Sequence, residues 1–232
     1  MAHHNTTPEA QEAFREKKVV KNPIKFKLQL NDEQKLAKQQ ILDNTITLLA
    51  GQAGSGKTLL ACQVALDGLL RKMYDKIIIT RPTVSKEDIG FLPGDLAEKM
   101  DPWLQPIYHN FFMLYDKAKV EKFIKDGQIE IVPVSFMRGR TFLNSCIIVD
   151  EAQNVTHEQM EMIATRIGLH SKMIICGDSR QIDLKFKKDS GFTYLYEAAN
   201  IVKNLTAITL NTNHRNEIVE ELREYYENHP IS

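Results

Sequence analysis

The sequence predicts a single α/β domain in which a mostly parallel β-sheet is sandwiched between helices. Short runs rich in Ile, Val and Leu recur along the chain and barely alternate with polar residues, as in strands buried on both faces. Longer amphipathic segments separate these runs, so the order strand, helix, strand implies right-handed βαβ units. A length of 232 residues fits one domain of ordinary size, and 43% hydrophobic residues can supply its core.

The regular elements are expected from Asn31 onward. Asn31 can cap a helix, because its side chain can accept a hydrogen bond from an N–H group of the first turn. That helix runs through Gln34, Leu36, Ala37 and Ile41. The expected strands are the apolar runs Ile46–Ala50, Ile77–Thr80, Ile129–Val134, Ile147–Asp150, Met173–Cys176 and Ala207–Leu210. Between the first two runs, Thr58–Leu70 has the pattern of a helix.

The segment Phe91–Lys125 departs from this alternation, and we expect it to form helices packed beside the sheet. It is punctuated by Pro93, Gly94, Pro102 and Pro106. Its aromatic residues have helical spacing: Trp103, Tyr108, Phe111, Phe112 and Tyr115. We interpret them as core residues in preference to a base-stacking platform.

Residues 1–28 are predicted to be a basic N-terminal arm that precedes the domain at residues 29–232. The arm is rich in charge and has little periodicity, and a stretch without acids holds Lys17, Lys18, Lys21, Lys25 and Lys27. A solvated arm and an arm that contacts phosphates both fit this pattern. The whole chain has 30 basic and 30 acidic residues, so only local basic patches can attract nucleic acid.

The composition also predicts a cytoplasmic protein that is not inserted in a membrane. The first eighteen residues lack the apolar region of a secretory signal, and no apolar run is long enough to span a bilayer. The cysteines Cys62, Cys146 and Cys176 lie in apolar runs without metal-ligand spacing. We interpret them as reduced packing residues, which suits a reducing compartment.

A phosphate-binding loop is the most specific motif in the chain. The complete pattern G-x-x-x-x-G-K-[ST] is formed by Gly51, Gln52, Ala53, Gly54, Ser55, Gly56, Lys57 and Thr58. It follows an apolar run and opens a helix, so that backbone N–H groups and the helix N-terminus can face an anion. We therefore expect a bound nucleoside triphosphate, with Lys57 on its β- and γ-phosphates and Thr58 on Mg²⁺.

Acidic residues follow a second expected strand, at the sheet edge where ligands of open α/β sheets bind. Asp150 ends the run that begins at Ile147, and Glu151 comes next. We expect Asp150 to hold the magnesium ion through water and Glu151 to act as general base on the attacking water. Asp178 and Gln181 follow a third strand and can hydrogen-bond the γ-phosphate or that water.

Other polar residues near this edge have more than one interpretation. Gln34 precedes Gly51 by seventeen residues, and its amide can read the edge of adenine or remain an exposed helical side chain. The guanidinium groups of Arg81, Arg138 and Arg140 suit phosphate, because each can bind two oxygens at once. They can contact nucleic acid or a neighbouring subunit, and surface salt bridges are the alternative.

These motifs, in this order, resemble the PhoH-like family of ATPases, which is related to the RecA-like core of superfamily-one helicases. The resemblance runs from about Leu30 to the end of the chain. Besides the phosphate-binding loop it rests on Thr80-Arg81-Pro82, Gly90–Asp95, Phe136–Thr141, Asp150–Asn154, Gly177-Asp178 with Gln181 and Asp183, and Ser190-Gly191. The departures are Lys86 in place of Gly, Lys185 in place of Pro, and Asn213–Asn216, which matches the family only loosely.

The resemblance implies a RecA-like P-loop NTPase domain that binds ATP and Mg²⁺ and hydrolyses ATP, with a link to RNA or single-stranded DNA. It places Gln34 on adenine, Asp150 and Glu151 on magnesium and water, and Gln181 on the γ-phosphate. Two alternatives stay open: an ATP-dependent RNA helicase, and an ATP-regulated nucleic-acid-binding module with little turnover. The presence of Glu151 argues against the second.

Assembly is the remaining expectation. Helicases of this type close ATP between two cores, and this chain has room for only one. An arginine supplied by a partner can complete such a site, and Arg215 is the candidate. The alternative for Arg215 is a salt bridge with a nearby acid such as Glu217 or Glu220. We therefore expect a homo-oligomeric ring, a hexamer by analogy with RecA-like proteins, with ATP at each subunit boundary.

Overall fold

The computed structural model of the chain describes residues 26, 28–82, 96–199, 201–212 and 217–229. In this part of the chain, parallel strands form one six-stranded sheet in the order β3-β2-β4-β5-β1-β6. The strands are β1 (Ile46–Gly51), β2 (Lys76–Thr80), β3 (Ile129–Ile131), β4 (Ser145–Val149), β5 (Lys172–Gly177) and β6 (Leu205–Leu210). The prediction of a parallel α/β domain is confirmed.

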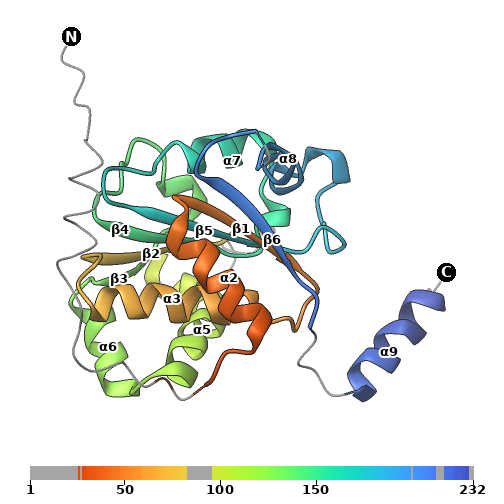
Figure 1. Cartoon of the computed structure of the whole chain (residues 1–232), viewed down its shortest axis with the longest axis horizontal. Coiled ribbons are helices and arrows are strands. Elements are labelled where there is room, and N and C mark those ends of the chain that lie inside the picture. Colours follow the sequence, from red (N-terminus) through yellow and green to blue (C-terminus); the bar gives the residue numbers. More distant parts are fainter. Residues whose placement is uncertain (1–25, 27, 83–95, 200, 213–216, 230–232) are drawn as a thin grey trace, which may run out of the picture.

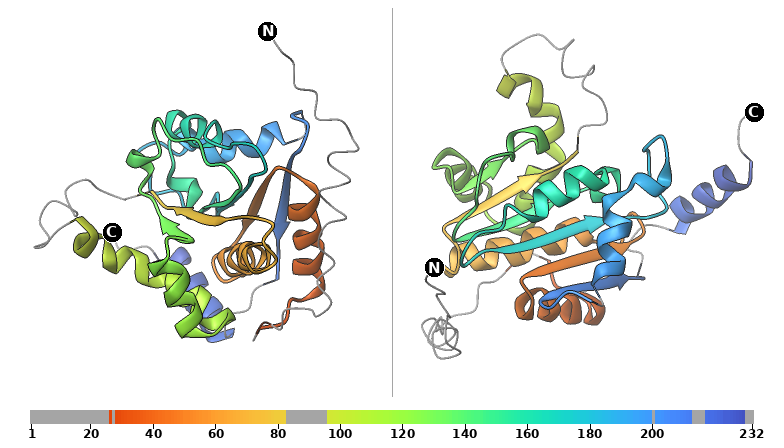
Figure 2. Two further views of the ribbon diagram at one scale, coloured as in Figure 1. Left: turned by 90° about the vertical axis from the view of Figure 1, so that its left-hand side faces the viewer. Right: turned by 90° about the horizontal axis from the view of Figure 1, so that it is seen from above.

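Helices cover both faces of this sheet (Figure 1). The helices α2 (Asp32–Asp43), α3 (Lys57–Leu70), α5 (Leu96–Leu114) and α6 (Lys117–Lys125) lie on one face. The opposite face carries α7 (His157–Ala164) and α8 (Gly191–Ala198). The two turned views of Figure 2 show the same three layers. A last helix, α9 (Glu217–Asn228), lies apart from the sheet.

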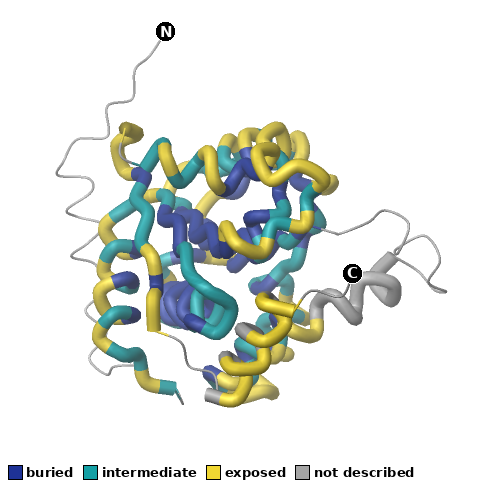
Figure 3. Tube along the Cα trace, turned by 90° about the vertical axis from the view of Figure 1, so that its right-hand side faces the viewer, coloured by how far each residue is buried: buried dark blue, intermediate teal, exposed yellow. Residues whose placement is uncertain are grey.

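Burial of the sheet on both faces explains why the apolar runs of its strands do not alternate with polar residues. Ile77 and Ile79 of β2 pack in the core under α3, whereas Ile78 between them packs in the core under α7 and α8. Successive side chains of a strand point to opposite faces, so a sheet covered on both faces needs apolar residues at every position. Buried residues accordingly gather along the central strands (Figure 3).

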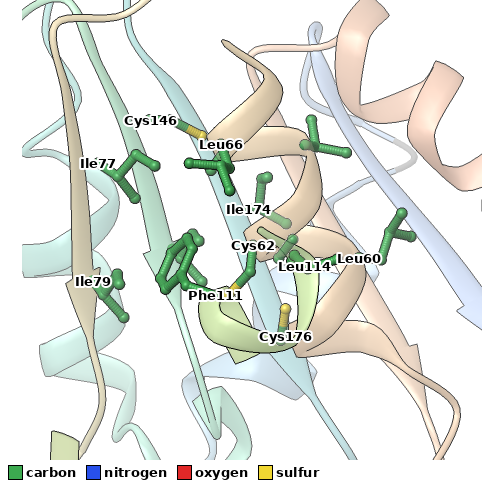
Figure 4. Packing of buried hydrophobic residues seen from close by; sticks show 14 of the residues in the cluster. Leu60, Cys62, Leu66, Ile77, Ile79, Phe111, Leu114, Cys146, Ile174 and Cys176 are labelled. Atoms are coloured by element: carbon green, nitrogen blue, oxygen red, sulfur yellow. The ribbon is translucent and has the colours of Figure 1, made fainter. Parts of the chain in front are cut away.

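The cysteines belong to one of these cores. Cys62 of α3, Cys146 of β4 and Cys176 of β5 are free and buried. Figure 4 shows their sulfur atoms among apolar side chains that include Phe111 and Ile174. Burial raises the pKa of Cys146 to about 12, so this thiol stays protonated at neutral pH. The interpretation of the three cysteines as packing residues is confirmed.

Helices α5 and α6 fill the segment that interrupts the strand–helix alternation. Phe111 is fully buried, and Phe112 and Tyr115 pack against the same core. These aromatics are therefore core residues, as predicted, while the side chain of Trp103 lies outside the described residues. Pro102 and Pro106 do not end a helix, because α5 runs through both.

Burial of the apolar face of α5 explains why the helix continues through its two prolines. Ile107, Phe111 and Leu114 are all buried on α5. Fully burying side chains of this kind contributes roughly 1.5–3 kcal/mol each. A proline inside a helix costs about 3 kcal/mol. The three buried side chains together contribute roughly 4.5–9 kcal/mol, which is of the size needed to offset about 6 kcal/mol for the two prolines.

Strand β3 is shorter than the apolar run that predicts it. The run extends to Val134, but the strand ends at Ile131 and a 3-10 turn occupies Val134–Phe136. Pro133 lies between them and has no N–H group to donate to a neighbouring strand. Proline thus ends the strand while the sequence remains apolar.

The apolar side of the C-terminal helix α9 is not covered by described residues. Ile218, Leu222, Tyr225 and Tyr226 are all more than half exposed. None of the helices in the described part of the chain combines the length and apolar composition that crossing a bilayer requires.

Candidate nucleotide-binding site

A cleft of about 640 Å³ opens at the edge of the sheet where the parallel strands end. Strand β5 lies between β1, which leads into the phosphate-binding loop, and β4, which leads to Asp150. The sequence-predicted residues that line the cleft are Gln34, Ala53, Gly54, Gly56, Lys57, Thr58, Arg81, Asp150, Glu151, Asp178 and Gln181. The fold therefore brings together segments that are up to 147 positions apart in the sequence, from 34 to 181.

The loop of residues 51–58 has backbone conformations that favour glycine. Gly51 has φ +148°, and a Cβ atom there would lie 2.4 Å from the carbonyl oxygen of Leu210. Gly56 has φ 84° and forms the N-cap of α3. Such positive φ values are costly for other residues. The glycines thus let the chain turn sharply from β1 into the start of α3.

Lys57 folds back over this loop. Its Nζ donates hydrogen bonds to the carbonyl oxygens of Gly51 at 2.7 Å and Gln52 at 2.8 Å. Burial lowers the pKa of Lys57, and the surrounding acidic groups oppose that shift. The ammonium group is held at the loop by neutral acceptors, which an anionic ligand can replace.

A side-chain hydrogen bond joins Thr58, at the end of the loop, to Asp150, which directly follows β4. The Thr58 hydroxyl donates to Oδ1 of Asp150 at 2.7 Å. Asp150 is buried, with 6% of its surface exposed. Burial raises the pKa of Asp150, and the bond from Thr58 opposes the rise. The site therefore holds a carboxylate that is poorly solvated.

Replacing this carboxylate by an amide is expected to stabilise the nucleotide-free chain. A carboxyl group whose pKa is raised by folding binds its proton more tightly in the folded state than in the unfolded state. Its protonated form therefore stabilises the fold at low pH, and this contribution is lost as the pH rises through the folded-state pKa. At neutral pH, Asp150→Asn removes the buried charge and should raise the melting temperature by about 2–4 °C for ~1 kcal/mol. Thermal unfolding without nucleotide measures this, and the gain should shrink toward acidic pH. An unchanged or lower melting temperature contradicts the conclusion that Asp150 is a poorly solvated, charged carboxylate.

Glu151 lines the cleft and has a left-handed backbone conformation, with φ 50°. Its Oε2 accepts a hydrogen bond from Nε2 of Gln153 at 2.8 Å, and its Oε1 lies 3.5 Å from a guanidinium nitrogen of Arg81. Gln153 is itself buried and accepts the N–H group of Asp178 at 3.1 Å. The carboxylate is thus held from two sides.

Sequence reasoning assigned no role to Gln153 and did not foresee that Arg81 pairs with Glu151. Gln153 is two residues beyond Glu151, within the motif Asp150–Asn154 that carries the family resemblance. That motif is the sequence signal for Gln153, but the contact of Gln153 with Asp178 depends on how β5 lies beside β4.

Gln34 and Gln181 both line the cleft. Gln34 is buried and donates from Nε2 to the carbonyl oxygen of Ser55 at 3.4 Å, so the alternative of an exposed helical glutamine is wrong. Its backbone N–H also donates to Oδ1 of Asn31 at 2.7 Å, which confirms the predicted helix cap. Gln181 is exposed, and its backbone N–H donates to the carbonyl oxygen of Asp178 at 3.0 Å.

Arg138 and Arg140 do not lie at this cleft, which corrects the expectation that both are near the ligand edge. Arg140 pairs with Glu130 at 3.0 Å, as its salt-bridge alternative expects, while Arg138 is exposed. The reason is the path of the chain toward the start of β4, where the N–H of Phe142 donates to the carbonyl of Arg166 at 3.0 Å. Arg215, residues 90–95 and the basic arm, apart from Phe26 and Leu28, lie outside the described residues.

The family model and the curated relatives that match this chain share one description. Residues 28–227 match the model of the family described as PhoH-like protein. The chain is 40% identical over 190 residues to the PhoH-like protein of Synechocystis sp., covering 81% of this chain and 58% of that relative. It is 41% identical over 187 residues to the PhoH-like protein of Bacillus subtilis, covering 79% and 59%. The chain spans somewhat more than half the length of these curated relatives.

A solved structure shares the fold. The large terminase from a thermophilic bacteriophage aligns with a TM-score of 0.52 at 10% identity, covering 88% of this chain and 51% of that one. At this level of identity the likeness concerns the arrangement of strands and helices alone.

Proposed function

The chain belongs to the PhoH-like protein family, and from this we propose that its RecA-like domain binds ATP with magnesium and hydrolyses the γ-phosphate. The observation that carries the proposal is the 2.7 Å contact of Thr58 with Asp150, beside Glu151 and next to a complete phosphate-binding loop. These groups meet at one cleft although they come from separate parts of the sequence.

The loop and Lys57 are proposed to bind the triphosphate. A charged phosphate oxygen is a better acceptor for an ammonium group than the two carbonyls that Lys57 now contacts. The helix α3 begins at Lys57, so its N-terminus also favours an anion at this point. Residues 51–58 therefore bind phosphate through charge, helix dipole and backbone N–H groups together.

Thr58 and Asp150 are proposed as the protein ligands of Mg²⁺. Their oxygen atoms are the ligand type that Mg²⁺ prefers, and the buried, poorly solvated carboxylate of Asp150 fits a site for a cation. Within the described residues, no group of three or more His, Cys, Asp or Glu could hold a metal. This fits an ion held by few protein ligands and by the phosphates, whose charge it neutralises when bound.

Glu151 is proposed as the general base. Its carboxylate is at the cleft, and its contacts with Gln153 and Arg81 fix its orientation. It takes a proton from the water that attacks the γ-phosphorus, while the bond from that phosphorus to the bridging oxygen breaks. Gln181 lies at the same cleft and is proposed to hydrogen-bond the γ-phosphate.

Gln34 is proposed to recognise adenine through its side-chain amide. Gln34→Glu keeps the acceptor of the helix cap, because Glu serves at this capping position as well as Gln, but it removes the NH₂ donor. We expect ATP affinity to fall several-fold, by about 1 kcal/mol for one hydrogen bond. The variant also loses the bond from Nε2 to the carbonyl oxygen of Ser55 and places a carboxylate at a buried position, so its melting temperature is measured beside its affinity. Titration with fluorescent ATP and GTP analogues checks this, and an unchanged preference for ATP over GTP contradicts it.

Coupling to single-stranded nucleic acid belongs to the proposal, and one assay separates it from its alternatives. Phosphate release is followed with and without single-stranded RNA, alongside a strand-separation assay. We expect hydrolysis that the RNA stimulates, without strand separation. Strand separation indicates a helicase, and RNA binding without hydrolysis indicates an ATP-regulated binding module.

A ring with ATP at the subunit boundaries is proposed as the assembly, with Arg215 reaching the neighbouring site. The chain ahead of this residue is anchored to α2, because the carboxylate of Glu33 accepts the N–H groups of Asn211 at 2.7 Å and Thr212 at 3.0 Å. Those bonds also lower the pKa of Glu33.

Mixing two inactive variants tests this assembly. A mixture of Arg215→Ala and Lys57→Ala chains should recover part of the ATPase activity, because some boundaries then combine an intact loop with an intact arginine. Each variant alone is the control. A chain that remains monomeric with ATP and still hydrolyses at full rate contradicts the ring.

A further inference from the structure

A segment beyond β5 combines an exposed aromatic ring with lysines, and we name residues 185–188 the Phe186 surface. The ring of Phe186 is 52% exposed. Nζ of Lys185 lies 5.5 Å from the ring centroid, and Nζ of Lys188 lies 5.9 Å from it. Lys187 lies between them in sequence and is also exposed. A half-exposed aromatic ring therefore carries two ammonium groups over it, in cation–π contact.

The lysines of this surface have no ion-pair partner within the described part of the chain. The flanking acids are Asp183 and Asp189, and Asp183 is engaged by Asn154. Both aspartates keep their negative charge, so residues 183–189 have a formal charge of +1, and the three lysines supply all of its positive charge.

Helix α6 shows that lysines over rings do not by themselves make such a surface. Lys117 lies 5.5 Å from the ring centroid of Phe112, and Lys119 lies 5.5 Å from that of Tyr115. Both rings pack against the core, so their faces are not free for a ligand. Lys117 is also paired with Glu121 at 3.7 Å. The Phe186 surface differs in that its ring is open and its lysines are unpaired within the described chain.

The Phe186 surface is joined to the proposed catalytic segment. Nδ2 of Asn154 donates to Oδ2 of Asp183 at 3.0 Å, and the N–H of Asp183 donates to Oδ1 of Asn154 at 2.7 Å. Asn154 ends the 3-10 turn Ala152–Asn154 that directly follows Glu151. A ligand on Phe186 is thus three residues from a contact that holds the segment of the general base.

We propose that the Phe186 surface binds single-stranded nucleic acid, with a base stacked on Phe186 and the flanking phosphates on Lys185, Lys187 and Lys188. An aromatic platform beside unpaired cations is complementary to a strand that offers base faces and phosphates at regular spacing. Neither interaction reads the sugar or the base edge, so RNA and DNA bind alike and without sequence preference. The inference rests on the proposed coupling of the ATPase to nucleic acid and gives that coupling a location.

Fluorescence anisotropy with labelled single strands of RNA and of DNA tests the surface. Phe186→Ala should weaken binding of both strands roughly tenfold, and Phe186→Tyr should restore it, because stacking on one ring is lost and regained. Affinity falls as salt rises, and replacing Lys185, Lys187 and Lys188 by Ala should make this fall less steep. The magnitude of the slope of log affinity against log salt concentration should decrease by about 2. Replacing Lys117, Lys119 and Lys122 on α6 by Ala removes the same number of charges and should leave that slope unchanged.

Several outcomes overturn the proposal. They are no binding of either strand to the natural chain, equal losses in the two lysine triples, and an unchanged affinity in Phe186→Ala. A change of oligomeric state in Phe186→Ala, without loss of strand binding, shows that a second copy covers the surface instead. Binding of a fluorescent ATP analogue is measured on each variant, so failure of the nucleotide site is seen separately from failure of the surface.

Discussion

Glu151→Gln is expected to leave ATP bound and to slow its hydrolysis about 10²–10⁴-fold. The amide has the size of the carboxylate but cannot take a proton from the attacking water. The neighbouring Gln153 still finds an acceptor in the new side chain, since its Nε2 now donates to one oxygen of Glu151. Single-turnover phosphate release and titration with a fluorescent ATP analogue measure the two halves of this prediction.

A matched control for this variant is Glu158→Gln, because Glu158 is an exposed acid of α7 that does not line the cleft. The same chemical change there should leave turnover as it is. If Glu151→Gln hydrolyses ATP at the rate of the natural chain, another group is the base.

Lys57→Ala is expected to weaken ATP binding about 10²–10⁴-fold, as the loss of two hydrogen bonds to a charged partner at about 1.5–3 kcal/mol each implies. Isothermal titration with ATP and Mg²⁺ measures the affinity. The two bonds from Nζ to Gly51 and Gln52 are also lost, so thermal unfolding shows whether the loop keeps its fold. Lys203→Ala, at an exposed lysine before β6, is the control. Equal affinities of the two variants for ATP contradict the role of Lys57.

Local sequence was sufficient to predict the elements that carry the site. The turn after β1 needs glycines at positive φ, and α2 needs a capping residue, so Gly51, Gly56 and Asn31 each mark their place in the chain. The central strands are buried on both faces, and this leaves continuous apolar runs that end at Gly51 and Asp150. These features depend on residues close together in sequence.

Local sequence patterns could not predict the contacts between segments that are far apart in the chain. The pairing of β4 with β5 brings Gln153 against Asp178, and the ends of β2 and β4 bring Arg81 against Glu151. Arg140 was placed at the wrong edge, because nothing local shows that the chain turns back toward β4 after Met137. In α5, burial of an apolar face overrides the two prolines that locally favour a break.

Steady-state phosphate release at saturating ATP tests the central claim most directly. The natural chain is assayed with Mg²⁺ and with EDTA, next to the Lys57→Ala chain prepared in the same way. We predict continuous release with Mg²⁺, and release at the level of the background with EDTA and in the variant. Equal release under all three conditions, or none by the natural chain with Mg²⁺ and single-stranded RNA present, contradicts the claim that this site hydrolyses ATP.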